Sequence, residues 1–123
     1  MSEMQSVEVV FVCSDAGESD ALFAYLNAMT APGGSVVVEG LEVNTAIGAF
    51  KSDKVISLVL AFSGSIVTGV VGNAVYDALK AAPHAQCVVA GEPIDKATAA
   101  DKAKLDEKVR ASAQPRRGGI AGH

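Results

Sequence analysis

The sequence predicts one small α/β or α+β domain, in which helices pack on a sheet of three to four strands. Three observations support this. Apolar, β-branched runs alternate with segments of helical periodicity in the order β-α-β-α-β-α. The chain has 123 residues, of which 50% are hydrophobic, enough for one modest core. Only 5% are aromatic, so Val, Ala, Leu and Ile must fill that core. A ferredoxin-like arrangement and a small open sandwich both fit the order.

The first two elements are a strand and a helix. Residues 7–13 are almost continuously apolar and β-branched, as in a strand buried on both faces. The turn at 14–20 contains good helix N-cap residues, and apolar residues then recur at helical spacing over 19–29. Pro32-Gly33-Gly34 ends this helix.

A second strand is expected over residues 35–44. Gly40 lies inside it, where a glycine weakens pairing and commonly marks a bulge or a bend. Residues 45–50 fit either a loop or a helical turn.

The longest uniform segment is 54–82, and it predicts a long central helix that ends before Pro83-His84. No charged residue occurs from Val55 to Tyr76, a run of 22 residues. At about 1.5 Å per residue the run measures roughly 33 Å, enough to cross a bilayer core. Asn73, Tyr76 and Asp77 form its polar end, which either anchors the helix by hydrogen bonds or contacts a partner.

Small residues recur every four positions along this predicted helix. They form two adjacent rows with almost no side-chain bulk, which would let another backbone approach closely. The helix could lie on the sheet of its own chain, pack against a symmetry mate, or insert into a membrane. We call these residues the small-residue strip: Ser57, Ala61, Ser65, Gly69 and Asn73 in one row, and Gly64, Thr68 and Gly72 in the other.

The last elements are a short strand at 86–90 and a helix at 96–113. The helix is rich in Ala, Lys, Asp and Glu, and Leu105 and Val109 give it a narrow apolar stripe. The domain should therefore span 1–113. Residues 114–123 contain Pro, Gly and two arginines and are expected to be a flexible tail.

Cys13 and Cys87 lie in apolar strand-like runs without a CxxC spacing, so we expect buried free thiols in a reducing compartment. Cys13 also precedes a helix, where a helix N-terminus can lower a thiol pKa. Asp15, Glu18 and Asp20 would oppose that effect and fit helix capping better than a metal site.

No catalytic, cofactor-binding or metal-ligating residues are predicted. The chain lacks the glycine-rich nucleotide motifs, and His84 and His123 do not form a metal-ligand pattern. The net charge of −4 and the absence of a basic block within 1–113 argue against a nucleic-acid partner.

These features favour a non-enzymatic interaction or assembly module that self-associates through the small-residue strip or docks a protein partner. One alternative is a membrane-active protein that inserts residues 55–76 as a transmembrane helix. Another is a small enzyme that uses Cys13 at the strand-to-helix turn. No signal peptide is recognisable, so a cytoplasmic location is expected, with membrane association possible.

Overall fold

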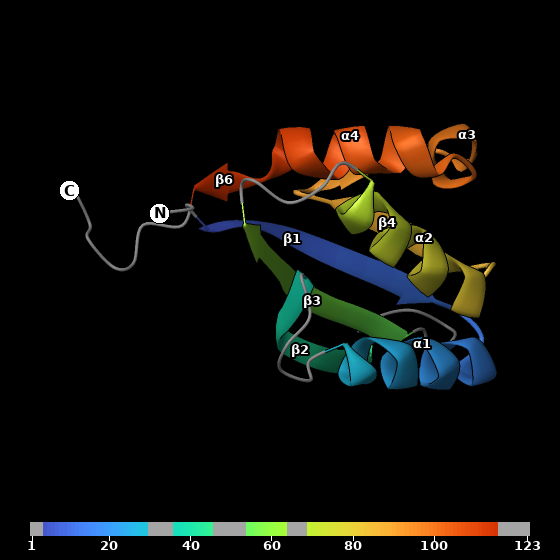
Figure 1. Ribbon diagram of the computed structural model, residues 1–123. Helices are drawn as coiled ribbons and strands as arrows, with labels where there is room; N and C mark the ends of the chain where they lie inside the picture. Colours follow the sequence, from blue (N-terminus) through green and yellow to red (C-terminus); the bar gives the residue numbers. More distant parts are fainter. Residues whose placement is uncertain (1–3, 30–35, 46–53, 64–68, 116–123) are drawn as a thin grey trace.

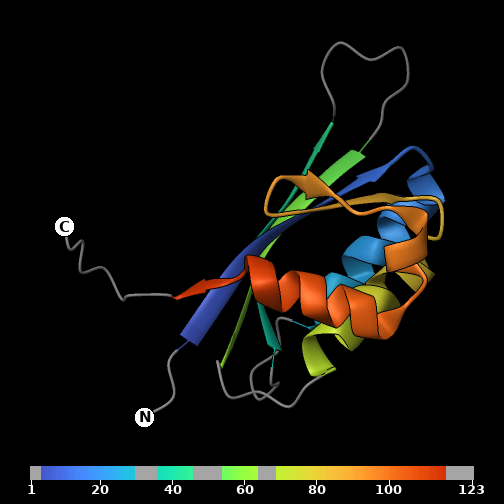
Figure 2. The same cartoon turned by 90° about the horizontal axis from the view of Figure 1, so that it is seen from above.

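The computed structural model describes residues 4–29, 36–45, 54–63 and 69–115 (Figure 1). These residues form an α+β fold with the helices on one side of an antiparallel sheet (Figure 2). The strands are β1 (Met4–Cys13), β2 (Val36–Thr45), β3 (Lys54–Ser63), β4 (Gln86–Val89), β5 (Glu92–Pro93) and β6 (Gln114–Pro115). The helices are α1 (Ala16–Ala28), α2 (Val70–Ala81), α3 (Lys96–Ala99) and α4 (Lys102–Ser112).

The sheet has the strand order β2-β3-β1-β4-β5, and the short strand β6 pairs with β1 beyond the end of β4. β1 and β3 pair over their full lengths, from Met4 opposite Ser63 to Cys13 opposite Lys54. Every pairing is antiparallel, and the order along the chain up to α3 is β-α-β-β-α-β-β-α. The predicted order β-α-β-α-β-α is therefore wrong, because it lacks strands β3 and β5.

The predicted long helix over 54–82 is also wrong. Its first ten residues form strand β3, and the helix α2 covers only Val70–Ala81. Side chains in β3 alternate between the two faces of the sheet, so that Ile56, Leu58 and Leu60 are buried against the helices. Gly69 has φ +98°, a left-handed conformation that no α-helix can run through. The absence of charge made two elements look like one.

The remaining elements largely agree with the prediction. The strands expected at 7–13, 35–44 and 86–90 and the helix at 19–29 are present with shifted ends. The irregularity expected at Gly40, a bulge or a bend, is confirmed, because the register of β2 against β3 shifts between Glu39 and Glu42 and Gly40 has φ +60°. The helix expected at 96–113 is divided into α3 and α4, and the Asp101 side chain caps the start of α4.

The first two residues of the predicted tail, Gln114 and Pro115, pair with Ser6 and Gln5 of β1. Of the ambiguous segment 45–50, Thr45 ends β2, and residues 46–50, like residues 116–123, lie outside the described part of the chain.

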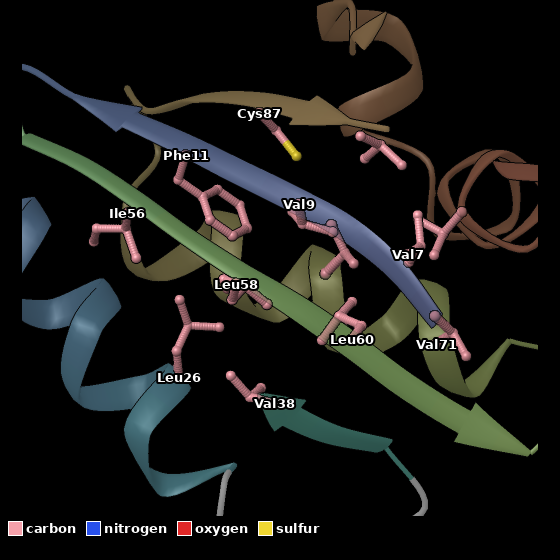
Figure 3. Close-up of a cluster of buried hydrophobic side chains, with 14 of the residues drawn as sticks. Val7, Val9, Phe11, Leu26, Val38, Ile56, Leu58, Leu60, Val71 and Cys87 are labelled. Atoms are coloured by element: carbon pink, nitrogen blue, oxygen red, sulfur yellow. The ribbon is translucent and has the colours of Figure 1, made fainter. Parts of the chain in front are cut away.

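The core lies between one face of the sheet and the helices α1, α2 and α4 (Figure 3). Alternate residues of β1, namely Val7, Val9, Phe11 and Cys13, point into it and are almost fully buried. Their neighbours across β3 and β4 point the same way, because paired residues of an antiparallel sheet share a face. The helices contribute Leu22, Leu26, Val71, Val75, Ala78, Leu105 and Val109.

The helices α2 and α4 pack unusually closely at Gly72. A Cβ atom added to Gly72 would lie 2.4 Å from the Asp106 Cβ and 2.5 Å from its Cα. The Gly72 backbone N–H donates a 2.9 Å hydrogen bond to the buried Asp106 carboxylate. Because the N-cap Gly69 has no side chain to cap the helix, Asp106 satisfies one of the free donors at the start of α2. Among the described residues, no helix is long and apolar enough to cross a membrane.

Candidate functional site

The small-residue strip does not form one continuous surface. Ser57 and Ala61 lie in β3, and Gly69, Gly72 and Asn73 lie at the start of α2. Gly72 is buried against α4 of the same chain, whereas Asn73 is exposed and hydrogen-bonds Asp77 over 3.4 Å. Gly64, Ser65 and Thr68 lie outside the described residues. The close backbone approach expected from the strip occurs at Gly72, within a single chain.

A first candidate surface is the face of the sheet opposite the helices, which we call the open face. The register places Ser57 and Ala61 there, because they alternate with the buried residues Ile56, Leu58 and Leu60 of β3. The centre of the open face is apolar and half-buried within the single chain. Its valines are Val10 and Val12 of β1, Val55 and Val59 of β3, and Val88 of β4.

Carboxylates flank this apolar centre. Glu8 of β1 and Glu39 of β2 both pair with Val59, on either side of it, and Glu42 of β2 pairs with Ser57. Because paired residues share a face, all three glutamates project from the open face. The surface therefore combines valines with excess negative charge.

A second candidate surface is a groove at the C-terminal end of α2, with a volume of about 720 Å³. Its walls come from the end of α2, the connection to β4, and α3. The volume falls within the roughly 300–1,000 Å³ typical of small-molecule sites. The lining residues, which define the groove, are Tyr76, Leu79, Lys80, Pro83, His84, Ala85, Gln86, Lys96, Ala99 and Ala100.

The charged side chains that line the groove are cationic. Lys80 and Lys96 are exposed, and neither forms an ion pair with a residue that the structure describes. The Lys80 ammonium lies 5.8 Å from the centre of the Tyr76 ring, and the Lys102 ammonium of α4 lies 5.2 Å from it. Both distances are within the range of cation–π attraction, so Tyr76 gathers two ammonium groups beside the groove.

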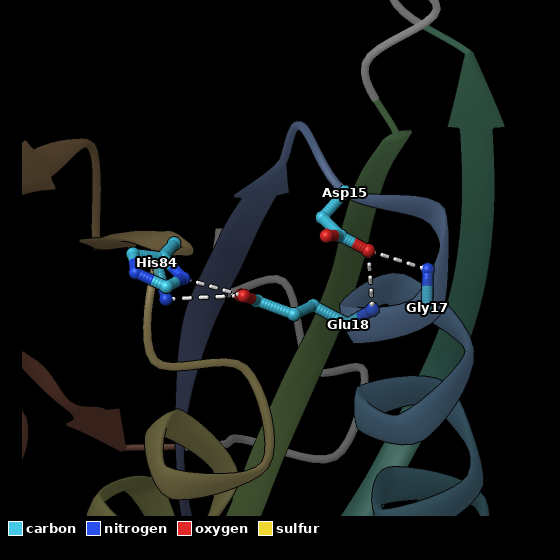
Figure 4. A network of polar contacts seen from close by, with 4 residues as sticks. All are labelled: Asp15, Gly17, Glu18 and His84. Carbon is cyan, nitrogen blue, oxygen red and sulfur yellow. Dashed lines mark hydrogen bonds and ion pairs between the residues drawn. The ribbon is translucent and has the colours of Figure 1, made fainter.

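His84 is held in place by Glu18, which lies 66 residues earlier in the sequence (Figure 4). The Glu18 carboxylate of α1 accepts the His84 backbone N–H at 2.9 Å and the Nδ1–H at 2.6 Å. The hydrogen bond and charge of Glu18 raise the pKa of His84 above its usual value of 6.5. Since Nδ1 donates to Glu18, the other ring nitrogen, Nε2, is left for the groove, and the side chain is 82% exposed.

Cys13 lies near this contact but does not have the properties of a nucleophile. Its side chain is 1% exposed, and both cysteines are buried free thiols, as predicted. Burial, together with the negative charge of Glu18, raises the Cys13 pKa above 9.0. A raised pKa favours the thiol form over the nucleophilic thiolate.

Two of the three acidic residues at the start of α1, Asp15 and Glu18, have structural partners. Asp15 caps α1 by accepting hydrogen bonds from the backbone N–H groups of Gly17 and Glu18, at 2.7 and 3.2 Å (Figure 4). Glu18 is engaged by His84, and Asp20 is exposed on α1. Within the described part of the chain, no cluster of three or more His, Cys, Asp or Glu side chains could hold a metal ion.

Sequence reasoning identified neither surface. The alternation of residues over 54–63 was the available signal for the open face, and the absence of charge concealed it. The groove had no comparable signal: its lining residues lie within 76–86 and 96–100, and only the fold shows that these two stretches enclose a concavity. Comparisons with protein-family models, with characterised proteins and with solved structures found no match for this chain.

Proposed function

We propose that the protein is a non-enzymatic assembly module that self-associates by packing the open faces of two copies against each other. The observation that carries this proposal is the row of half-buried valines on a sheet face that none of the described helices, α1 to α4, covers. A sheet with one apolar face normally buries it against another layer. A second, identical sheet is the simplest such layer, since two-fold symmetric dimers are the commonest oligomers.

This proposal replaces the interface expected from the small-residue strip and keeps one of its residues. Ser57 lies on the open face, partly exposed, and adds little bulk beside the valines, whereas Ala61 on the same face is only 1% exposed. Gly72 is already buried by α4 and has no surface to offer a partner.

The size of the open face fits a reversible dimer. The strands β1, β2 and β3 have ten residues each. With a rise of about 3.4 Å per residue and a spacing of about 4.8 Å, they cover roughly 500 Å². A standard interface buries about 800 Å² per partner, so we expect association in the micromolar range or weaker. Repulsion between the glutamates of the two copies lowers the affinity further.

The same strand order supports the finer description of the fold. Read across the sheet, the strand order β4-β1-β3-β2 is that of two split β-α-β units in one antiparallel sheet. We therefore propose the ferredoxin-like arrangement rather than a sandwich. The two buried free thiols support the proposal of a reducing, cytoplasmic location.

The other candidate functions have less support. A membrane-inserting helix over 55–76 loses its structural basis, because Lys54–Ser63 is a strand. An enzyme that uses Cys13 would need a thiolate, which burial and Glu18 disfavour.

Analytical ultracentrifugation from micromolar to millimolar concentration tests the proposal. The wild-type protein should show a reversible monomer–dimer equilibrium, and Val10→Lys at the centre of the open face should abolish it. Val43→Lys is the matched control, because Val43 pairs with Ile56 on the opposite face and is 40% exposed. Glu8→Gln should strengthen association by removing a repelling charge, and added salt should do the same.

A wild-type protein that stays monomeric at the highest concentration would refute self-association. If Val10→Lys and Val43→Lys weakened the dimer equally, the interface would lie elsewhere. Circular dichroism of each variant must first show that the fold is retained, and Val88→Lys on β4 provides an independent probe of the same face.

A further inference from the structure

We propose that the groove at the end of α2 binds a small phosphate monoester attached to an apolar body. The groove is formed mainly by α2, the connection to β4 and α3, whereas the open face belongs to the strands. This proposal therefore does not depend on self-association through the open face. It is carried by the shape of the groove, its lining and the charges around it.

The first argument is the mixture of apolar and cationic groups in one concavity. Leu79, Pro83, Ala85 and Ala99 supply apolar surface, whereas Lys80, Lys96 and His84 supply positive charge or hydrogen-bond donors. Small-molecule sites combine apolar walls with a few polar groups that orient the ligand in this way. A ligand that matches the groove must carry an apolar part and an anionic part.

The second argument is the unbalanced charge. The whole chain has 14 acidic and 10 basic residues, yet no carboxylate lines the groove. Glu18, and more weakly Asp15, raise the pKa of His84, whereas Lys96 lowers it by repulsion. The Glu18 carboxylate therefore balances the charge of His84, while Lys80 and Lys96 form no ion pair with a described residue. Lys102 of α4 adds a third ammonium group, which lies 5.2 Å from the centre of the Tyr76 ring beside the groove. An anion between these groups would relieve their mutual repulsion.

The third argument is the preorganised histidine. Glu18 fixes both the backbone and Nδ1 of His84, so the imidazole is oriented before any ligand arrives. With Nδ1–H donating to Glu18, a protonated His84 presents Nε2–H as a donor to an anionic oxygen. Because Glu18 comes from α1 and His84 from the α2–β4 connection, the fold itself sets this geometry.

The charge on the ligand follows from the type of cation. Lysine ammonium groups are compact point charges without the fork of arginine, so they favour dense charge over the flat geometry of a carboxylate. The two ammonium groups match the two charges of a dianionic phosphate better than a single carboxylate, and His84, whose charge Glu18 balances, adds a hydrogen-bond donor. The apolar body of the ester would then rest on Leu79, Pro83 and Ala99.

NMR titration of the full chain, labelled with ¹⁵N, provides the test. Phenyl phosphate is the probe, and benzoate, inorganic phosphate and a short polyglutamate peptide are the comparison ligands, all at one ionic strength. Phenyl phosphate should shift the amide resonances of the groove and should bind more tightly than the comparison ligands. Lys80→Gln and Lys96→Gln should each weaken binding roughly two- to fivefold, as expected for loss of one exposed ion pair.

Lys104→Gln is the control, because Lys104 is an equally exposed lysine on α4 that does not line the groove. It should leave the affinity unchanged, and the amide spectra should show that all three variants keep the fold. Absence of shifts at the groove would overturn the proposal. So would an equal loss of binding in Lys104→Gln, equal affinity for benzoate, or equal affinity for inorganic phosphate. Tighter binding of polyglutamate would reassign the groove to an acidic peptide.

Discussion

Replacing Gly72 with alanine tests the packing of α2 on α4 most directly. The added methyl group would have to lie 2.4 Å from the Asp106 Cβ and 2.5 Å from both the Asp106 Cα and backbone nitrogen. Two of these three atoms belong to the backbone of α4, so no side-chain rotation can remove the clash. The helices must move apart, and the Gly72–Asp106 hydrogen bond must lengthen.

The expected cost combines three contributions. Forcing a methyl group into a packed interface costs about 1–3 kcal/mol. Weakening a hydrogen bond to a buried carboxylate costs roughly 1.5–3 kcal/mol. Alanine is about 1 kcal/mol better than glycine inside a helix, which offsets part of the loss. The net destabilisation should therefore be about 3 kcal/mol, or roughly 10 °C in melting temperature for a chain of this size.

Urea denaturation followed by circular dichroism measures this change. Asn73→Ala is the matched control, since Asn73 is the next residue of the same helix and is exposed. It should change the free energy of unfolding by less than about 0.5 kcal/mol. Equal stability of Gly72→Ala and the wild-type protein would refute the close approach of α2 and α4.

A second variant covers the case in which Gly72→Ala fails to fold. Asp106→Ala removes the acceptor of the Gly72 N–H without adding bulk, and should cost about 2 kcal/mol. Asp106→Asn keeps an oxygen acceptor at the same position and should cost less. If the two Asp106 variants were equally stable, the carboxylate would not be acting as the cap of α2.

Three further predictions concern other parts of the fold. Glu18→Gln should lower the pKa of His84 in an NMR titration; because the wild-type pKa is raised, the stabilisation by this pair should be complete below about pH 6.5 and lost as the pH rises through the raised value. An unchanged His84 pKa would contradict the contact. Ala90 and Gly91, with φ +51° and +83°, form the two-residue turn between β4 and β5, so Ala90→Asn should stabilise the protein by about 1 kcal/mol in urea denaturation. A destabilised variant would argue against this turn. Cys13 and Cys87 should resist a thiol reagent at neutral pH until urea unfolds the chain, since burial raises the Cys87 pKa to about 12 and also raises that of Cys13. Rapid native labelling of Cys13 would revive the enzyme hypothesis.

The sequence by itself determined the elements whose signals are local. The β-branched run at 7–13 has one backbone preference, and Gly40 indicated a bulge because a strand-interior glycine has no side chain to pack. The buried thiols followed in the same way from their apolar neighbours.

Only the tertiary structure decided the segment 54–82. A charge-free run is compatible with a buried strand and with a buried helix. The pairing partners β1 and β2, which settle the choice, lie outside the segment. The same limit applies to both candidate surfaces. The open face exists because residues of four strands share one side of the sheet. The Glu18–His84 contact beside the groove likewise joins residues that are 66 positions apart. Local propensity carries no information about such contacts, since their free energy appears only when distant segments pack together.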